Sequence, residues 1–158
     1  MNKLADQLAL VLTTLWVGAL WAIGVTAYML FTTLKGLQSD SQLAGLLAGK
    51  LFNLVSYLGL FSGFFLLIHR LIRYGTAALK QAYFWAVFMM LLLVAFGHFG
   101  IQPLLAQLKV QAILSGAING DVMKSVFASR FERWHGIASV AYVLECLLGF
   151  VVVLRAKQ

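Results

Sequence analysis

Four polar side chains recur at steps of three or four residues in the last apolar stretch of the chain. They are His135, Ser139, Tyr142 and Glu145, and this spacing places them along one face of an α-helix. A carboxyl group such as that of Glu145 is costly inside a membrane, so it indicates either a functional site or a polar contact that holds helices together. Both interpretations stay open.

Polar residues also interrupt two earlier apolar stretches. Lys50 is followed at helical spacing by Asn53, and it is interpreted either as a lysine that reaches the headgroups or as part of a site. His98 lies in "FGHFGIQPLL", four residues before Gln102 and five before Pro103. Because proline removes a backbone donor, we expect the helix to kink or end here. His98 then either hydrogen-bonds a freed carbonyl or has a functional role.

Three of these residues are predicted to lie at a similar depth in the membrane. In a bundle that crosses the membrane four times, Lys50, His98 and His135 fall in the half of the membrane away from the termini. Two histidines and a lysine are suited to a copper, iron or zinc ion, a haem with two axial ligands, or an anionic headgroup. We predict His98 and His135 as metal ligands, with Lys50 and Glu145 adjusting the charge. The ligand-binding candidates are Lys50, Asn53, His98, Gln102, His135, Ser139, Tyr142 and Glu145.

The elements that position these residues follow from composition. The chain has 158 residues, of which 62% are hydrophobic and 11% charged, whereas about 25% are charged in an average soluble domain. Residues 7–34, 43–67, 82–105 and 135–154 are each long enough to cross the bilayer as a helix. We predict an all-α membrane protein, a single domain over residues 1–158 that forms an up-down bundle of four transmembrane helices in contact with bilayer lipid.

The loop between the third and fourth spans is the longest and has its own pattern. In "GDVMKSVFASRFERW" the apolar residues recur near helical spacing, which predicts an amphipathic interfacial helix with Asp121 as its N-cap. Basic residues flank the spans on both sides, and the short segments that carry His69, Arg70 and Arg73 favour cytoplasmic termini. His69 is interpreted as marking the membrane interface.

The glycines and the net charge indicate which binding partners to expect. Gly45 and Gly49 form a small-residue face suited to close helix contact, which predicts packing and a homo-oligomer. The net charge is +7, but the basic residues flank apolar segments and do not form a stripe with interleaved aromatics, so we expect no nucleic-acid partner. The single cysteine, Cys146, excludes an intrachain disulfide.

Four stretches taken in order resemble a known family. The stretches "LWVGALWAIG", "LAGLLAGKLF", "IQPLLAQLK" and "RFERWHGIASVAYVLECLLG" are similar to the transmembrane-protein-205-like family, also described as domain of unknown function 4149. The resemblance implies a four-helix protein of the bacterial inner membrane. Its most characteristic part corresponds to His135, Gly136 and Ser139, although the chain has Ala138 where the family pattern has a serine. The family is distantly similar to copper-resistance D-type membrane proteins, which implies metal ligands as the first residues to test.

Three functions remain open. The first is an uncharacterised integral membrane protein that binds or handles a metal ion or haem through its intramembrane histidines. The second is a small transporter or lipid-binding module for an anionic or amphiphilic ligand, and the third is a non-catalytic assembly subunit. An enzyme stays open as well, because redox chemistry on a membrane quinone or porphyrin requires no hydrolase triad, paired carboxylates or phosphate loop.

Overall fold

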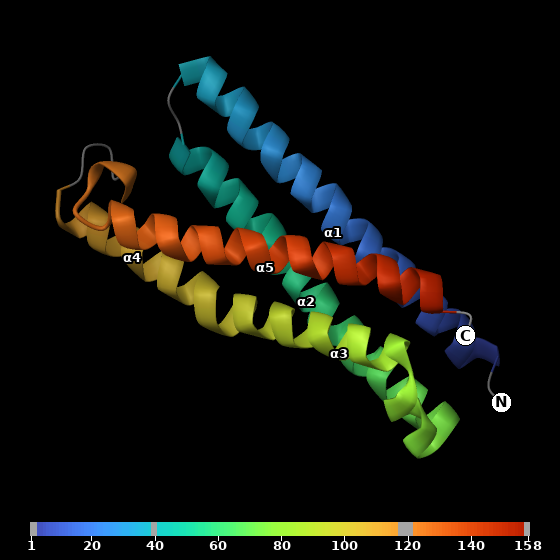
Figure 1. Ribbon diagram of the computed structural model, residues 1–158. Coiled ribbons are helices and arrows are strands. Elements are labelled where there is room, and N and C mark those ends of the chain that lie inside the picture. Colours follow the sequence, from blue (N-terminus) through green and yellow to red (C-terminus); the bar gives the residue numbers. More distant parts are fainter. Residues whose placement is uncertain (1–2, 39–40, 117–121, 157–158) are drawn as a thin grey trace.

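The protein is built from helices throughout the part that the computed structural model describes, residues 3–38, 41–116 and 122–156. In chain order these are α1 (Lys3–Gln38), α2 (Ser41–Tyr74), the 3₁₀ helix η1 (Gly75–Lys80), α3 (Ala82–Ala95), the π-helical segment η2 (Phe96–Ile101), α4 (Gln102–Leu114), the short 3₁₀ helix η4 (Val122–Lys124) and α5 (Ala128–Arg155) (Figure 1). Within the described residues, four stretches are long and apolar enough to cross a membrane, Lys3–Leu34, Leu43–Lys80, Ala82–Leu114 and Ala128–Arg155. The predicted four-helix membrane fold is confirmed.

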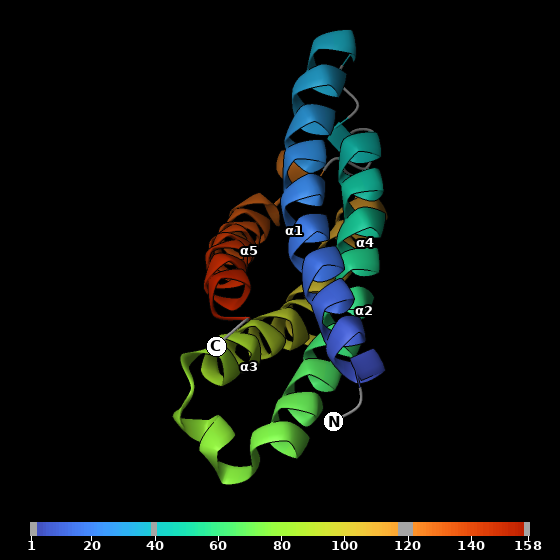
Figure 2. The same cartoon turned by 90° about the vertical axis from the view of Figure 1, so that its right-hand side faces the viewer.

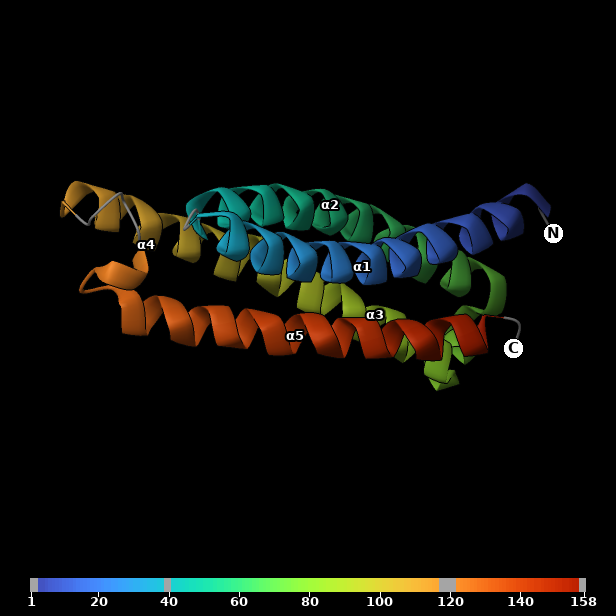
Figure 3. The same ribbon diagram turned by 90° about the horizontal axis from the view of Figure 1, so that it is seen from above.

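The four membrane helices form two pairs that diverge toward one end. α1 packs along α2 and α3 packs along α5, and the contact between α2 and α3 joins the pairs. Both termini lie at the same end of the molecule (Figures 1 and 3). At the other end the tip formed by α1 and α2 separates from the tip formed by α4 and α5, and Figure 2 shows α5 to one side of α1 and α2. The bundle is therefore closed toward its termini and splayed away from them.

The core lies in the closed half and centres on Trp16 of α1, which has 0% of its surface exposed. The other large side chains that are fully buried come from all four membrane helices: Leu20, Leu66, Val87, Met90, Ile101 and Val152. Gly59 of α2 allows the close approach, because a Cβ atom there would lie 2.6 Å from Trp16 Nε1. Most of the remaining large apolar side chains are exposed on the outside of the helices, which is the surface expected of helices that contact lipid.

The third membrane helix does not end near Pro103. It continues from α3 through η2 into α4, up to Leu114. Pro103 has no N–H to bond to the carbonyl of Phe99, and the wider π-helical turns just before it accommodate this break. The helix also passes Gln107, Lys109 and Gln111, which end the apolar run but are good helix formers. The predicted loop after residue 105 is correspondingly shorter.

The separate interfacial helix that the sequence predicts between the third and fourth spans is wrong in its extent. η4 covers one turn, Ser125 Oγ then donates to Val122 O at 2.7 Å and accepts the N–H of Phe127 at 3.1 Å, and α5 begins at Ala128. A serine that bonds neighbouring backbone groups favours a turn over a continuous helix. The amphipathic residues Phe131 and Trp134 are thus part of α5, and Asp121, the predicted N-cap, lies outside the described residues.

The connection between the second and third spans is also more ordered than expected. α2 continues through His69 to Tyr74, and it ends where Gly75 adopts a positive φ of 54°. Glycine is the usual residue at this position after a helix, because it has no Cβ to clash in the left-handed conformation. The turn that follows is the 3₁₀ helix η1.

Candidate ligand cavity

A cavity of about 1290 Å³ lies between the diverging helix pairs. It begins in the middle of the bundle at Leu20 of α1, Ser56 of α2 and Glu145 of α5, and it extends away from the termini to Phe31 and Phe131. Most of its lining is apolar. Pockets for small molecules are typically about 300–1,000 Å³, so this cavity has room for a ligand as large as a lipid.

The polar lining of the cavity contains most of the residues singled out from the sequence. It includes Lys50, Asn53, Ser56, Gln102, Lys109, His135, Ser139, Tyr142 and Glu145. Of the eight candidates, His98 is the one that does not line the cavity. The polar stripe predicted on the last helix faces inward, as the spacing of its members requires.

The splayed end of the cavity carries basic side chains. Lys109 extends from α4 toward α2, where its Nζ would lie 3.3 Å from a Cβ atom placed on Gly45. The same Nζ is 5.8 Å from the ring centre of Phe131 and close enough to His135 to interact with it electrostatically. Lys50 lines the cavity from α2 and is exposed. Among the described residues, no carboxylate forms an ion pair with either lysine.

Three polar groups midway along the cavity are already hydrogen-bonded. Gln102 Nε2 donates to Ser56 Oγ at 3.2 Å, which ties α4 to α2, and Ser56 Oγ donates to the carbonyl of Phe52 at 2.8 Å. Ser139 Oγ donates to the carbonyl of His135 at 2.9 Å within its own helix. These groups are satisfied by the protein and are therefore poorer ligands than the lysines.

The inner end of the cavity is closed by Tyr142 and Glu145. The hydroxyl of Tyr142 donates to the carbonyl of Leu20 at 2.5 Å, and this contact joins α5 to α1. Glu145 is 4% exposed. The indole N–H of Trp16 interacts with its carboxyl group without forming a hydrogen bond of normal geometry. Among the described residues, neither Trp16 Nε1 nor Glu145 Oε1 has a hydrogen-bond partner.

His98 lies apart from this lining. Its ring is 4.7 Å from that of Tyr57 on α2 and 4.8 Å from that of Phe99, and its Nδ1 is buried without a partner among the described residues. The wider turn of the π-helical segment changes the angle between His98 and Gln102, so a spacing of four does not bring both to the cavity. In the described part of the chain, no group of three or more His, Cys, Asp or Glu side chains is arranged to hold a metal ion. The predicted metal or haem site therefore has no support.

The sequence did not reveal that Lys109 and two glycines line the cavity. Lys109 fell in the predicted loop, and the signal that it belongs to a helix is its four-residue spacing from Leu105 and Ile113.

Gly45 and Gly49, predicted to pack against another helix, line the cavity, and a Cβ atom on Gly49 would meet nothing within 4 Å. Within the chain Gly49 is therefore not a packing glycine, whereas Gly45 lies against the side chain of Lys109. The homo-oligomer expected from this face stays a prediction.

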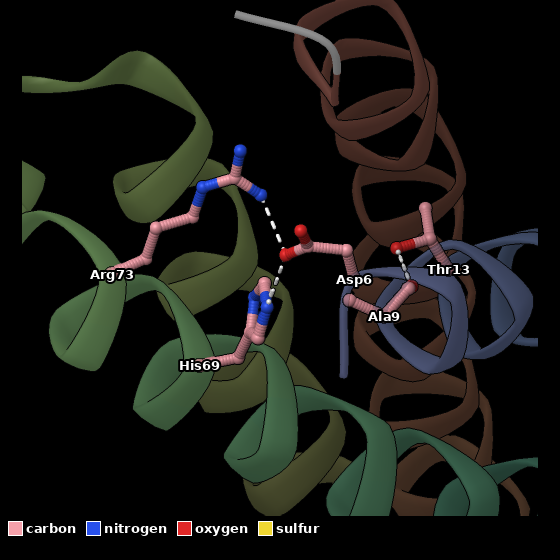
Figure 4. Close-up of polar contacts among 5 residues, drawn as sticks. All are labelled: Asp6, Ala9, Thr13, His69 and Arg73. Atoms are coloured by element: carbon pink, nitrogen blue, oxygen red, sulfur yellow. Dashed lines mark hydrogen bonds and ion pairs between the residues drawn. The ribbon is translucent and has the colours of Figure 1, made fainter. Parts of the chain in front are cut away.

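A second polar cluster lies at the closed end, near the termini (Figure 4). Asp6 Oδ1, in the first turn of α1, is 3.0 Å from His69 Nε2 and 2.6 Å from Arg73 Nη1 of α2. Arg70 is 5% exposed, donates to Gln81 Oε1 at 2.5 Å, and lies over the ring of Tyr83. These contacts fasten the closed end of the bundle, and the role of Asp6 was not apparent from the sequence.

Comparison with known proteins assigns a family. The family model described as Domain of unknown function (DUF4149) matches residues 11–113, which include α2, α3, η2 and most of α1 and α4. No curated protein and no solved structure matches the chain. The expected relation to transmembrane-protein-205 and to copper-resistance proteins stays a prediction. Because the match covers well over half of its length, the chain belongs to the DUF4149 family, and it is a multi-pass membrane protein of that family.

Proposed function

We propose that this protein binds an anionic amphiphile in the cavity between its helix pairs. The observation that supports the proposal most is one cavity with an apolar lining and three basic side chains, Lys50, Lys109 and His135, at its splayed end. The alkyl chain of the ligand lies against the apolar lining, and its anionic headgroup lies among the basic side chains.

The position of the basic groups fits a ligand that enters from the bilayer. Lys50 and Lys109 lie toward the ends of membrane-spanning helices that are remote from the termini, where lysine ammonium groups reach the level of the lipid headgroups. Each basic residue near an anionic surface contributes about 1 kcal/mol of attraction. Both lysines line the cavity, so their ammonium groups can contact the anionic headgroup of a bound ligand.

A lipid-like ligand is better supported than a metal ion or haem. Metal sites in proteins need several ligands that converge on one point. His98 and His135 have different surroundings: one contacts Tyr57 and the other lines the cavity. The large apolar volume has no role in holding a metal ion, whereas it is what an alkyl chain requires.

The orientation and location of the protein are part of the proposal. The closed end carries Arg70, Arg73, Lys80 and Arg155, which favours a cytoplasmic position for both termini. The splayed end of the cavity then opens in the outer half of the bacterial inner membrane. This places the ligand in the leaflet that faces away from the cytoplasm.

Ligand retention tests the proposal. The protein is purified in a mild detergent, incorporated in nanodiscs of mixed phosphatidylglycerol and phosphatidylcholine, and the bound lipid is identified by native mass spectrometry. We expect phosphatidylglycerol to be enriched over phosphatidylcholine. Lys50→Ala and Lys109→Ala should each lower this enrichment about fivefold, the factor that corresponds to ~1 kcal/mol for each lysine. Lys80→Ala removes a lysine at the closed end and should change nothing.

A steric variant tests the cavity itself. Gly49→Phe places a ring where a Cβ atom has no neighbour within 4 Å, on the lining of the cavity, whereas Gly18 has equally open surroundings but does not line it. We expect Gly49→Phe to abolish lipid retention and Gly18→Phe to preserve it. Equal retention by both variants and by the wild type would show that the lipid binds elsewhere.

A further inference from the structure

The innermost part of the cavity contains a polar group that an alkyl chain does not use. Glu145 lines the cavity and is 4% exposed, and its Oε1 is buried without a hydrogen-bond partner among the described residues. An unsatisfied buried polar group is destabilising, and the penalty is larger for a charged group than for a neutral one. A ligand that supplies the missing hydrogen bond would therefore gain affinity at this point.

The protein groups around Glu145 do not supply that bond. The Tyr142 hydroxyl is directed to the carbonyl of Leu20, and the Ser56 hydroxyl donates to the carbonyl of Phe52. Cys146 is next to Glu145 in the chain and also lines the cavity, but a thiol is a weak donor. Trp16 Nε1 lies nearby without forming the bond and does not line the cavity. Glu145 itself lines the cavity, so a ligand in the cavity can approach its carboxyl group.

The rise of α5 gives the distance between Glu145 and the basic side chains at the splayed end of the cavity. His135 and Glu145 are ten residues apart on one helix, which corresponds to a separation of roughly 15 Å along its axis. Both line the same cavity. A single extended chain can therefore reach the basic residues with one end and Glu145 with the other.

We infer that the natural ligand is an amphiphile with two polar groups, an anionic headgroup and a hydroxyl group roughly 15 Å along its chain, and that Glu145 selects it by binding the hydroxyl. The inference rests on the proposed function and adds the second polar group. A hydroxyl is both a donor and an acceptor, so it pairs with a carboxyl group in either charge state. Glu145 thus acts as a specificity-determining residue.

Two synthetic acids test the inference. Dodecanoic acid and 12-hydroxydodecanoic acid differ only in the terminal hydroxyl, and their extended chain is similar in length to the roughly 15 Å between His135 and Glu145 along the axis of α5. Each acid displaces a fluorescent fatty acid from the full-length, delipidated protein in detergent. We expect the wild type to bind the hydroxylated acid about tenfold more tightly, the factor typical of one hydrogen bond to a charged or strongly polar partner.

Variants of Glu145 assign the preference to this side chain. Glu145→Gln keeps hydrogen-bonding groups and should keep a preference for the hydroxylated acid. Glu145→Leu leaves the hydroxyl without a partner and should reverse the preference, while its binding of dodecanoic acid shows that the variant is folded.

The outcomes separate the two proposals. If the wild type binds both acids equally, the inference is overturned and the proposed function stands. If the wild type binds neither acid, both are overturned. A preference that survives in a Glu145→Leu variant able to bind dodecanoic acid would also refute the role of Glu145. The wild-type comparison needs no variant, so misfolding of one cannot mask the result.

Discussion

Replacing Gly59 by alanine should destabilise the bundle through a clash with Trp16. A Cβ atom at Gly59 would lie 2.6 Å from Nε1 and 3.0 Å from Cε2 of the indole, whereas non-bonded heavy atoms are most stable about 3.5–4.0 Å apart. One helix must therefore move by about 1 Å. The indole cannot simply rotate away, because it is fully buried in the core.

The size of the effect follows from a comparison with Gly18→Ala. Overpacking of this kind costs about 1–3 kcal/mol, and the exchange of glycine for alanine in a helix contributes about 1 kcal/mol in the opposite direction. A Cβ atom at Gly18 would meet nothing within 4 Å, so that variant has the favourable contribution alone. The difference between the two variants isolates the clash, and we expect 1–3 kcal/mol, roughly a 5- to 140-fold change in the unfolding equilibrium.

The assay is reversible unfolding in mixed micelles with increasing sodium dodecyl sulfate, followed by the circular dichroism of the helices. Both variants are measured with the wild type in the same lipid and detergent mixture, and the free energies are extrapolated to zero denaturant in the usual linear way. Equal stability of Gly59→Ala and Gly18→Ala would refute the reasoning, because it would mean that Trp16 does not pack against the backbone of α2.

Three further predictions concern the closed end of the molecule and the inner part of the cavity. Asp6→Asn weakens the partly exposed ion pairs with α2 and should destabilise the protein by less than about 1 kcal/mol. This loss of stability should be smaller at high salt. A loss that is the same in dilute and concentrated sodium chloride contradicts an ionic origin. Tyr142→Phe removes the 2.5 Å hydrogen bond to the carbonyl of Leu20 and should lower the unfolding free energy by about 0.5–1.5 kcal/mol. The same detergent titration measures this change. An unchanged unfolding free energy would show that α5 is held in place without this bond. Cys146 lines the cavity, so its thiol should react with N-ethylmaleimide more slowly when dodecanoic acid is present. A cysteine introduced at Gly18 should react at an unchanged rate. Protection of both cysteines or of neither counts against a ligand in the cavity.

The fold was predictable because the bilayer restricts the chain so strongly. Apolar stretches of this length can satisfy their backbone groups in lipid only as helices, which makes the number of membrane helices a local property of the sequence. The stripe from His135 to Glu145 was predictable for the same reason, since the relative directions of side chains on one regular helix follow from their spacing alone.

Helix ends and the third span were less predictable. The apolar run ends near residue 105, but α4 continues to Leu114, because polar residues such as Lys109 form helices well although they lower the hydropathy. Lys109 was consequently missed as a cavity residue. The π-helical turns before Pro103 removed His98 from the face on which a regular helix would place it.

The sequence by itself determined four membrane helices, one polar face on the last of them, and basic groups toward helix ends. The tertiary structure alone decided that Lys50, Lys109 and Glu145 line one cavity, that His98 does not, and that Gly59 rather than Gly49 permits close packing. The physical reason is that spacing fixes directions only within a helix. The angle at which two helices meet depends on how all their side chains fill the space between them, here around Trp16.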